Sequence, residues 1–235
     1  MEKILGIDTS SIVATVALAE ENRLIGEYYI ESEKNHSEKL MLLIEAMLKE
    51  CELEPNSIDA VAVGTGPGSF TGLRIGVVTA KGLAFALGVP MISVNTLDGL
   101  AYNVYKFGGL ICPILDALRG NVYTALYKGE RNGIKRLSEY DVININDVLD
   151  EVSRYKEPVI FLGDGVPLFK KEIIRKIGEN AIIAPTCLLM PRASSIAALG
   201  IDGLKKGKEE SPFTLMPFYL RKSQAEIQME RKKGR

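Results

Sequence analysis

Residues 4–18 read ILGIDTSSIVATVAL, in which one apolar run ends at Asp8 and a second follows the polar turn TSS. Short apolar runs bounded by polar turns are typical of buried β-strands. A third such run, RLIGEYYI, follows another polar turn. The chain is therefore predicted to open with a β-meander, with strands at residues 3–8, 14–19 and 23–30.

Helices and strands alternate after this meander. Apolar residues at i, i+3, i+4 and i+7 predict an amphipathic helix over residues 37–51. A short strand then leads into the glycine-rich segment GTGPG, residues 64–68, and into a longer helix. The alternation predicts an α/β fold. Its further elements are expected as strands at residues 58–63 and 91–94 and helices at residues 71–87 and 96–105.

The opening pattern recurs in PILDALRGNVYTAL, residues 113–126. Asp116 again ends an apolar run, and Ala125 and Leu126 follow it at the offsets at which Ala17 and Leu18 follow Asp8. A third strand is expected after residue 133, and a strand at 159–162 with a helix at 166–177 continues the α/β alternation. These matches predict a duplicated chain; the alternative is that two unrelated meanders share such features.

The predicted organisation is two lobes and a tail. The N-terminal lobe covers residues 1–107 and the C-terminal lobe residues 108–220. The tail, residues 221–235, is basic. Its cations either contact RNA phosphates or belong to a solvated chain end. They are Arg221, Lys222, Arg231, Lys232, Lys233 and Arg235.

Composition excludes several classes of protein. With 46% hydrophobic residues among 235, the chain can bury a large core, which excludes a disordered protein. Lys and Arg number 29 against 30 Asp and Glu, so no overall positive field can hold nucleic acid. The first residues carry an acid where a signal peptide is basic, and no apolar run approaches the roughly 20 residues of a membrane span. We expect a cytoplasmic protein.

Cysteine and histidine are scarce. Cys51, Cys112 and Cys187 are far apart and odd in number, which argues against a disulfide framework and a thiolate metal site. The single histidine, His36, excludes a metal site built on paired histidines. We therefore expect no metal in this chain.

Two glycine- or hydroxyl-rich turns resemble phosphate sites. The turn of Asp8, Thr9 and Ser10 could cradle a phosphate and hold Mg²⁺ through water, or its side chains could satisfy the backbone of the turn. The segment GTGPGSFTGLRIG links a strand to a helix N-terminus, but it lacks the lysine of a Walker loop. Neither turn establishes nucleotide binding.

Small residues recur every four positions along the helix at 71–87. Another helix could approach this face closely. The helix at 37–51 is a plausible companion because its apolar surface is widened by Met41 and Leu42. Two alternatives follow: the small-residue face of the helix at 71–87 forms a contact between two molecules, or it packs against the sheet of its own chain. Its small residues are Gly72, Gly76, Ala80 and Ala84.

Several of these segments together resemble the TsaB family, also called YeaZ. The resemblance rests on ILGIDTSSIVATVAL, HSEKL, VGTGPGSFTGLRIGVVTAKGLAFALGVP, PILDALRGNVYTALY and PFYLRKSQAE. It implies the actin-like, sugar-kinase-like fold of two ribonuclease H-like lobes, in agreement with the duplication. It also implies a role in making threonylcarbamoyladenosine beside the anticodon of tRNA, as a non-catalytic scaffold that pairs with and stabilises the transferase TsaD.

The resemblance further implies partners and an interface. The partners are TsaD, the ATPase TsaE, tRNA through the complex, and a second copy of the chain when TsaD is absent. ATP, Mg²⁺ and a metal are implied only for the partners, and no cofactor for this chain. Leu118 and Asn121 depart from the family's usual Arg and Glu. The interface is expected at Met41, Leu42, Gly72, Arg74, Gly76, Ala80 and Ala84.

Two rival functions belong to the enzyme class. The first is a small kinase or ATPase that uses Asp8 and Asp116. The second is a glycoprotease, which is weak because the chain has no paired histidines and no recognisable Ser–His arrangement.

Overall fold

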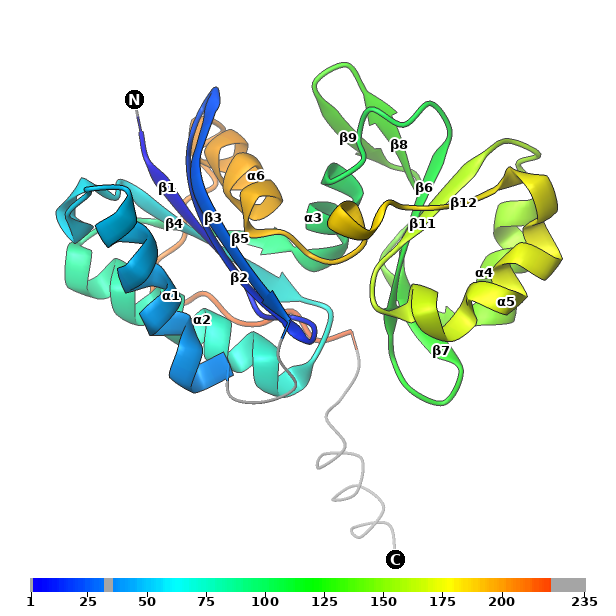
Figure 1. Ribbon diagram of the computed structural model, residues 1–235, viewed down its shortest axis with the longest axis horizontal. Coiled ribbons are helices and arrows are strands. Elements are labelled where there is room, and N and C mark those ends of the chain that lie inside the picture. Colours follow the sequence, from blue (N-terminus) through cyan, green and yellow to red (C-terminus); the bar gives the residue numbers. More distant parts are fainter. Residues whose placement is uncertain (1, 32–35, 221–235) are drawn as a thin grey trace, which may run out of the picture.

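Two β-sheets, each flanked by helices, make up the molecule in the computed structural model, which describes residues 2–31 and 36–220 (Figure 1). The chain builds one sheet, crosses to the second, and returns to the first near its end. The basic tail predicted at residues 221–235 lies outside the described residues.

The N-terminal lobe has a five-stranded sheet in the order β3-β2-β1-β4-β5. The three strands of the meander are antiparallel, whereas β4 and β5 run parallel to β1. β1 is buried along its whole length, as its continuous apolar sequence predicts. The strands are β1 (Ile4–Asp8), β2 (Val13–Glu20), β3 (Arg23–Glu31), β4 (Ala60–Gly66) and β5 (Met91–Asn95).

Helices cover both faces of this sheet (Figure 1). α1 (His36–Glu50) and α2 (Phe70–Leu87) pack on one face, and α6 (Ala193–Lys205) packs on the other. The short helix α3 (Thr96–Tyr102) lies between the lobes, in contact with α6 and with the second sheet. A 3₁₀ turn, η1 (Pro55–Ser57), precedes β4.

The C-terminal lobe repeats this plan. Its path β10-β7-β6-β11-β12 has the same sequence of antiparallel and parallel pairs as the first sheet, so β6 corresponds to β1. The predicted α/β fold of two duplicated lobes is confirmed. The elements of this lobe are β6 (Leu110–Asp116), β7 (Asn121–Thr124), the hairpin β8 (Tyr127–Glu130) and β9 (Gly133–Arg136), β10 (Asp141–Asn144), α4 (Ile145–Ser153), β11 (Val159–Leu162), α5 (Gly165–Ile177), η2 (Gly178–Asn180), β12 (Ala181–Ile183) and η3 (Thr186–Leu188).

The two meanders differ in register by one residue. Asp8 lies opposite Thr15, seven residues on, whereas Asp116 lies opposite Val122, six residues on. The predicted equivalence of Ala125 and Leu126 with residues of β2 is therefore wrong, because β7 ends at Thr124. The third strand of this meander is also not the one after residue 133, which forms a hairpin arm, but β10.

The predicted lobe boundary needs correction at the C-terminal end. The prediction places residues 108–220 in the C-terminal lobe, but α6 packs on the N-terminal sheet and the segment after it contacts the N-terminal lobe. Gly200 lies so close to Ala62 of β4 that a Cβ there would overlap the alanine methyl group. Met91 forms a β-bridge with Glu210, and Leu215 is buried in the core under α2. The C-terminal lobe therefore ends near Arg192.

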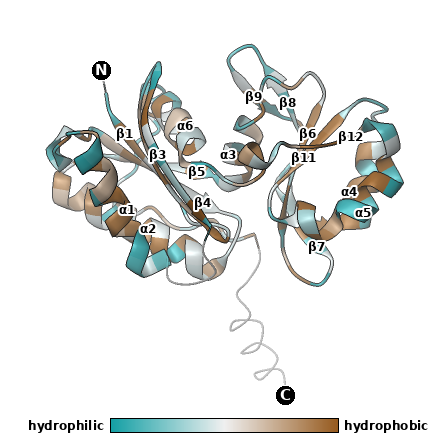
Figure 2. Ribbon diagram, in the orientation of Figure 1, coloured by the Kyte–Doolittle hydropathy of each residue, from teal (hydrophilic) through white to brown (hydrophobic). Residues whose placement is uncertain are grey.

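Apolar side chains separate into cores on the two faces of each sheet. In Figure 2 much of the strands is brown or white, and helices such as α4 and α5 carry both brown and teal residues. α2 alone, among the described helices, is long and apolar enough for a bilayer crossing by length and composition, contrary to the sequence-based expectation. Its inner face, which includes Val77 and Ala80, is nevertheless packed in the core of the lobe.

Candidate functional site

The turn after β1 places Asp8 in the interior of the N-terminal lobe. Its Oδ1 accepts hydrogen bonds from Ser10 N (2.9 Å) and Ser10 Oγ (2.6 Å), while Oδ2 has no partner within residues 2–31 and 36–220. Burial raises the pKa of Asp8 to about 6, against the lowering effects of the Ser10 bonds and the nearby His36. The carboxyl group is thus held by the turn itself.

The start of α2 closes this turn. Thr9 Oγ1 donates to the carbonyl of Gly72 (2.8 Å), and Ser69 N donates to the carbonyl of Ser10 (2.7 Å). A Cβ at Gly72 would overlap the Thr9 carbonyl oxygen. The Thr9 and Ser10 hydroxyls are therefore both engaged within the chain, whereas Asp8 Oδ2 has no partner among the described residues. A phosphate or Mg²⁺ site at this turn stays a prediction.

Asp116 occupies the corresponding position in the C-terminal lobe, as predicted. Its Oδ1 accepts from Leu118 N (2.9 Å), and its own N–H donates to Asp164 Oδ1 (2.8 Å). Leu118 and Arg119 both have positive φ angles, 64° and 59°, in a turn that leaves Leu118 exposed. The turn presents an apolar side chain where a phosphate site needs donors.

Sequence reasoning missed Asp164. Burial raises the pKa of this carboxyl group to about 6, with the charge of Asp116 adding to the shift and backbone N–H groups opposing it. The glycine-flanked sequence Gly163-Asp164-Gly165, between β11 and α5, could have indicated it. β11 corresponds to β4 of the first lobe, and β4 is likewise followed by a glycine-rich turn and a helix.

The small-residue face of α2 packs inside its own lobe. Gly72, Gly76, Ala80 and Ala84 are all buried, and a Cβ at Gly76 would overlap Thr9 Oγ1. Their burial does not fit the expected interface with another molecule and agrees with the alternative, in which this face packs within its own lobe. The physical reason is that the glycines let α2 approach the turn after β1.

The other predicted interface residues are exposed. Met41 and Leu42 on α1 are 46% and 62% exposed, and Arg74 is exposed on α2. Two residues that the sequence reasoning did not single out, Val78 and Phe85, are each 66% exposed on α2. We call these five residues the α1/α2 surface.

A segment near the end of the described chain, the C-terminal strap (residues 211–219), runs beside α2. Lys81 Nζ donates to the carbonyl of Leu215 (2.9 Å), and Phe213 packs edge-on against Phe85 with ring centroids 5.6 Å apart. Arg74 lies 3.9 Å above the Phe70 ring, and its Nε donates to Tyr219 Oη (3.2 Å). The strap therefore borders the α1/α2 surface.

No group of three or more His, Cys, Asp or Glu side chains in the described part of the chain is arranged to hold a metal ion. His36 Nε2 lies 3.0 Å from the Ser11 carbonyl oxygen. The three cysteines are free thiols. The features left for function are the exposed α1/α2 surface and the two turns that follow β1 and β6.

Comparison with known proteins assigns the family. The tRNA threonylcarbamoyladenosine biosynthesis protein TsaB of Bacillus subtilis (strain 168) is 37% identical over 223 residues, which cover 95% of this chain and 96% of the relative. This chain belongs to the TsaB family. The TsaB of Escherichia coli (strain K12) is 28% identical over 231 residues, covering 95% of this chain and 96% of the relative.

Other comparisons extend the TsaB match. The family described as TsaD, tRNA N6-adenosine threonylcarbamoyltransferase, matches residues 27–229. A Pseudomonas aeruginosa protein with similarity to the peptidase YEAZ superposes with a TM-score of 0.81 at 26% identity, covering 94% of this chain and all of that one. Component A of the (R)-2-hydroxyglutaryl-CoA dehydratase of Acidaminococcus fermentans has a TM-score of 0.51 at 9% identity, covering 88% and 100% of the two chains, and is similar in fold alone.

Proposed function

We propose that this chain takes part in making threonylcarbamoyladenosine in tRNA, as a non-catalytic subunit that pairs with and stabilises a TsaD-type transferase. The observation that carries the proposal is the match to TsaB proteins over 95% of the chain. The implied third protein is a TsaE-type ATPase, and tRNA is reached through the complex. In the absence of the transferase, two copies of the chain pair through the same surface.

The α1/α2 surface supports a role in pairing. Four of its five residues are large and apolar, and they lie on two neighbouring helices beside the apolar strap. Contiguous exposed apolar patches with a polar rim mark sites of protein association. Arg74, held against Phe70 and Tyr219, provides a charged group fixed in place by its neighbours.

The closed turns support the non-catalytic part of the proposal. A phosphate needs free donors, but the Ser10 hydroxyl donates to Asp8 within the turn after β1 and the Thr9 hydroxyl donates to the Gly72 carbonyl on α2. The equivalent turn in the second lobe presents Leu118. We therefore propose that the chain uses neither ATP nor Mg²⁺ nor a metal of its own.

One observation favours the small-kinase alternative. Asp8 and Asp116 end corresponding strands in the two lobes, which is where paired acidic side chains could face a nucleotide. Calorimetry with Mg-ATP on the isolated chain separates the two functions. The proposal expects no binding and no turnover; tight binding with turnover favours the kinase.

Charge placed on the α1/α2 surface tests the pairing. Leu42→Glu and Val78→Glu each put a carboxylate where the partner packs, so we expect at least tenfold weaker pairing with the transferase in size-exclusion chromatography and calorimetry. Leu168→Glu is the matched control, because Leu168 is equally exposed but lies on α5 of the other lobe. Circular dichroism must show that all three variants fold.

The outcomes are distinct. Pairing that survives both Leu42→Glu and Val78→Glu contradicts the interface. A reaction with both partner proteins, threonylcarbamoyl-AMP and tRNA, followed by mass spectrometry of the nucleosides, tests the pathway. If the modified nucleoside forms at the same rate with and without this chain, the proposed role is refuted.

A further inference from the structure

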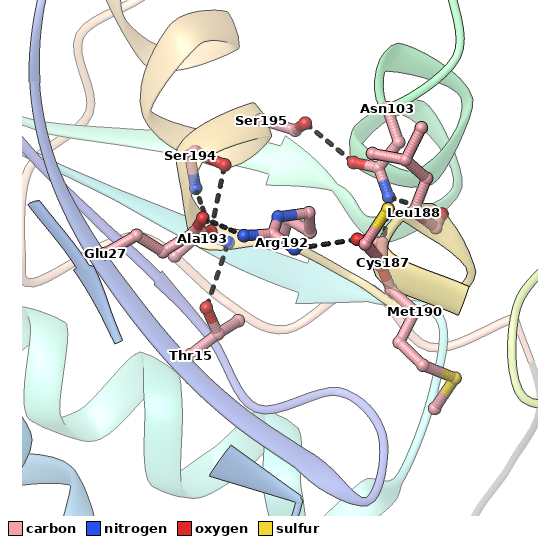
Figure 3. A network of polar contacts seen from close by, with 10 residues as sticks. All are labelled: Thr15, Glu27, Asn103, Cys187, Leu188, Met190, Arg192, Ala193, Ser194 and Ser195. Atoms are coloured by element: carbon pink, nitrogen blue, oxygen red, sulfur yellow. Dashed lines mark hydrogen bonds and ion pairs between the residues drawn. The ribbon is translucent and has the colours of Figure 1, made fainter. Parts of the chain in front are cut away.

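The two crossings between the lobes are bonded to each other at Asn103, directly after α3. Asn103 Nδ2 donates to the carbonyls of Leu188 (3.1 Å) and Met190 (2.9 Å), which lie on the returning crossing (Figure 3). Asn103 Oδ1 accepts from Ser195 Oγ (2.7 Å) at the start of α6. One amide side chain thus joins the outgoing crossing, the returning crossing and the helix that packs on the N-terminal sheet.

The returning crossing is also fixed to the N-terminal sheet by Glu27 of β3. Its Oε1 accepts from Ser194 N (3.0 Å) and Ser194 Oγ (2.9 Å), so it caps the first turn of α6 (Figure 3). Its Oε2 is paired with Arg192, which also donates through Nη1 to the Cys187 carbonyl (2.7 Å). The Glu27 side chain is only 6% exposed, so breaking these bonds leaves a buried charge without partners.

The other end of α3 is bonded to the C-terminal lobe through Asp98. Its Oδ1 accepts from Tyr127 Oη (2.7 Å) and Tyr140 Oη (2.9 Å), and its Oδ2 lies 2.8 Å from Tyr140 Oη. Burial and the charge of Asp98 raise the pKa of both phenols, so they remain donors at neutral pH. The Arg136 guanidinium lies 3.9 Å above the Tyr140 ring.

We infer that α3 is a clamp that holds the two lobes at one fixed angle. Asp98 and Asn103 lie at opposite ends of this seven-residue helix and bond to different segments, so rotation of one lobe against the other breaks one set of bonds. Each broken bond leaves partly or fully buried polar groups without a partner. The chain behaves as one rigid body, and the angle between its two lobes does not change.

Distances between spin labels on the two lobes test this clamp. Labels are attached at Glu45→Cys on α1 and Lys171→Cys on α5, two exposed positions, in a background with Cys51→Ser and Cys187→Ser. Cys112 stays in place because it is fully buried and its thiol pKa is raised to about 12. Pulsed electron resonance then gives the distribution of interlobe distances.

The parent protein is expected to give one narrow distribution. Asn103→Leu combined with Tyr140→Phe removes bonds at both ends of α3, and we expect the distribution to become at least twofold broader or its mean to shift. The matched control is Asn56→Leu, the same chemical change at an exposed position in η1. We expect the distribution of the control to equal that of the parent.

Two results overturn the clamp: a broad distribution in the parent, or an unchanged distribution in the folded double variant. If Asn103→Leu prevents folding, Asn103→Ala with Tyr140→Phe replaces it, since alanine removes the same amide hydrogen bonds without adding a larger apolar side chain. The same two outcomes then decide, and far-UV circular dichroism establishes folding in every case.

Discussion

Substitution of single glycines in α2 distinguishes internal packing of the small-residue face from an exposed ridge. Gly76→Ala adds a methyl group that overlaps Thr9 Oγ1, the atom that donates to the Gly72 carbonyl. Alanine gains about 1 kcal/mol over glycine in a helix interior, whereas overpacking costs about 1–3 kcal/mol and the lost hydrogen bond about 1 kcal/mol. We therefore expect the free energy of unfolding of Gly76→Ala to fall by about 1–3 kcal/mol.

Gly82→Ala is the matched control in the same helix. Nothing lies within 4 Å of a Cβ built at Gly82, so only the gain in helix propensity remains. We expect this variant to be more stable than the parent by about 0.5–1 kcal/mol. Urea unfolding followed by circular dichroism measures both variants. If Gly76→Ala is stabilised as much as Gly82→Ala, the packing of this face against the turn after β1 is refuted.

Three further predictions concern burial. The pKa of Asp8 is about 6 in the folded state, above the usual 3.8, so the folded state binds this proton more tightly than the unfolded state does. The resulting stabilisation is fully present below pH 3.8 and is lost as the pH rises through 6. Relative to Asp8→Asn, the free energy of unfolding of the parent should thus fall by up to about 3 kcal/mol over this window in urea titrations, and parallel pH profiles would contradict the assignment. Leu215→Ala leaves a cavity at a buried site and should lower the free energy of unfolding by about 2–5 kcal/mol. Met216→Ala, at an exposed neighbouring position, should leave it nearly unchanged in the same urea titration. Equal effects of the two changes would mean that the C-terminal strap is not anchored by Leu215. A thiol reagent should label the exposed Cys187 within minutes and reach Cys112 only when the protein unfolds, and early labelling of Cys112, checked by mass spectrometry of peptides, would argue against its burial.

The sequence predicts the two lobes better than the contacts that connect them. The buried strands β1 and β6 carry continuous apolar runs that end in Asp8 and Asp116, and this local pattern is enough to reveal the duplication. The one-residue difference in register could not be predicted, because it depends on how the turns at residues 9–12 and 117–120 close in space.

The residues that connect the two lobes are distant from one another in sequence. Glu27 and Arg192 are separated by 165 positions, and neither has a local pattern that points to the other. For the same reason the sequence-based prediction places α6 in the wrong lobe, because an apolar helix with small residues fits either sheet by composition. The small-residue face of α2 was equally ambiguous, since close packing onto a partner helix and onto its own sheet require the same spacing.

The return of the chain to the N-terminal sheet has a consequence for its biosynthesis. The face of this sheet that α6 covers carries Ile4, Ala62 and Ile92, and these side chains stay bare until residues 193–205 have left the ribosome. A domain whose first and last segments pack together can complete its core only after translation is nearly finished. Contacts between residues so far apart in sequence also form slowly, because a long stretch of chain must be closed into a loop. A fragment of residues 1–107 lacks this cover and should aggregate when it is expressed alone.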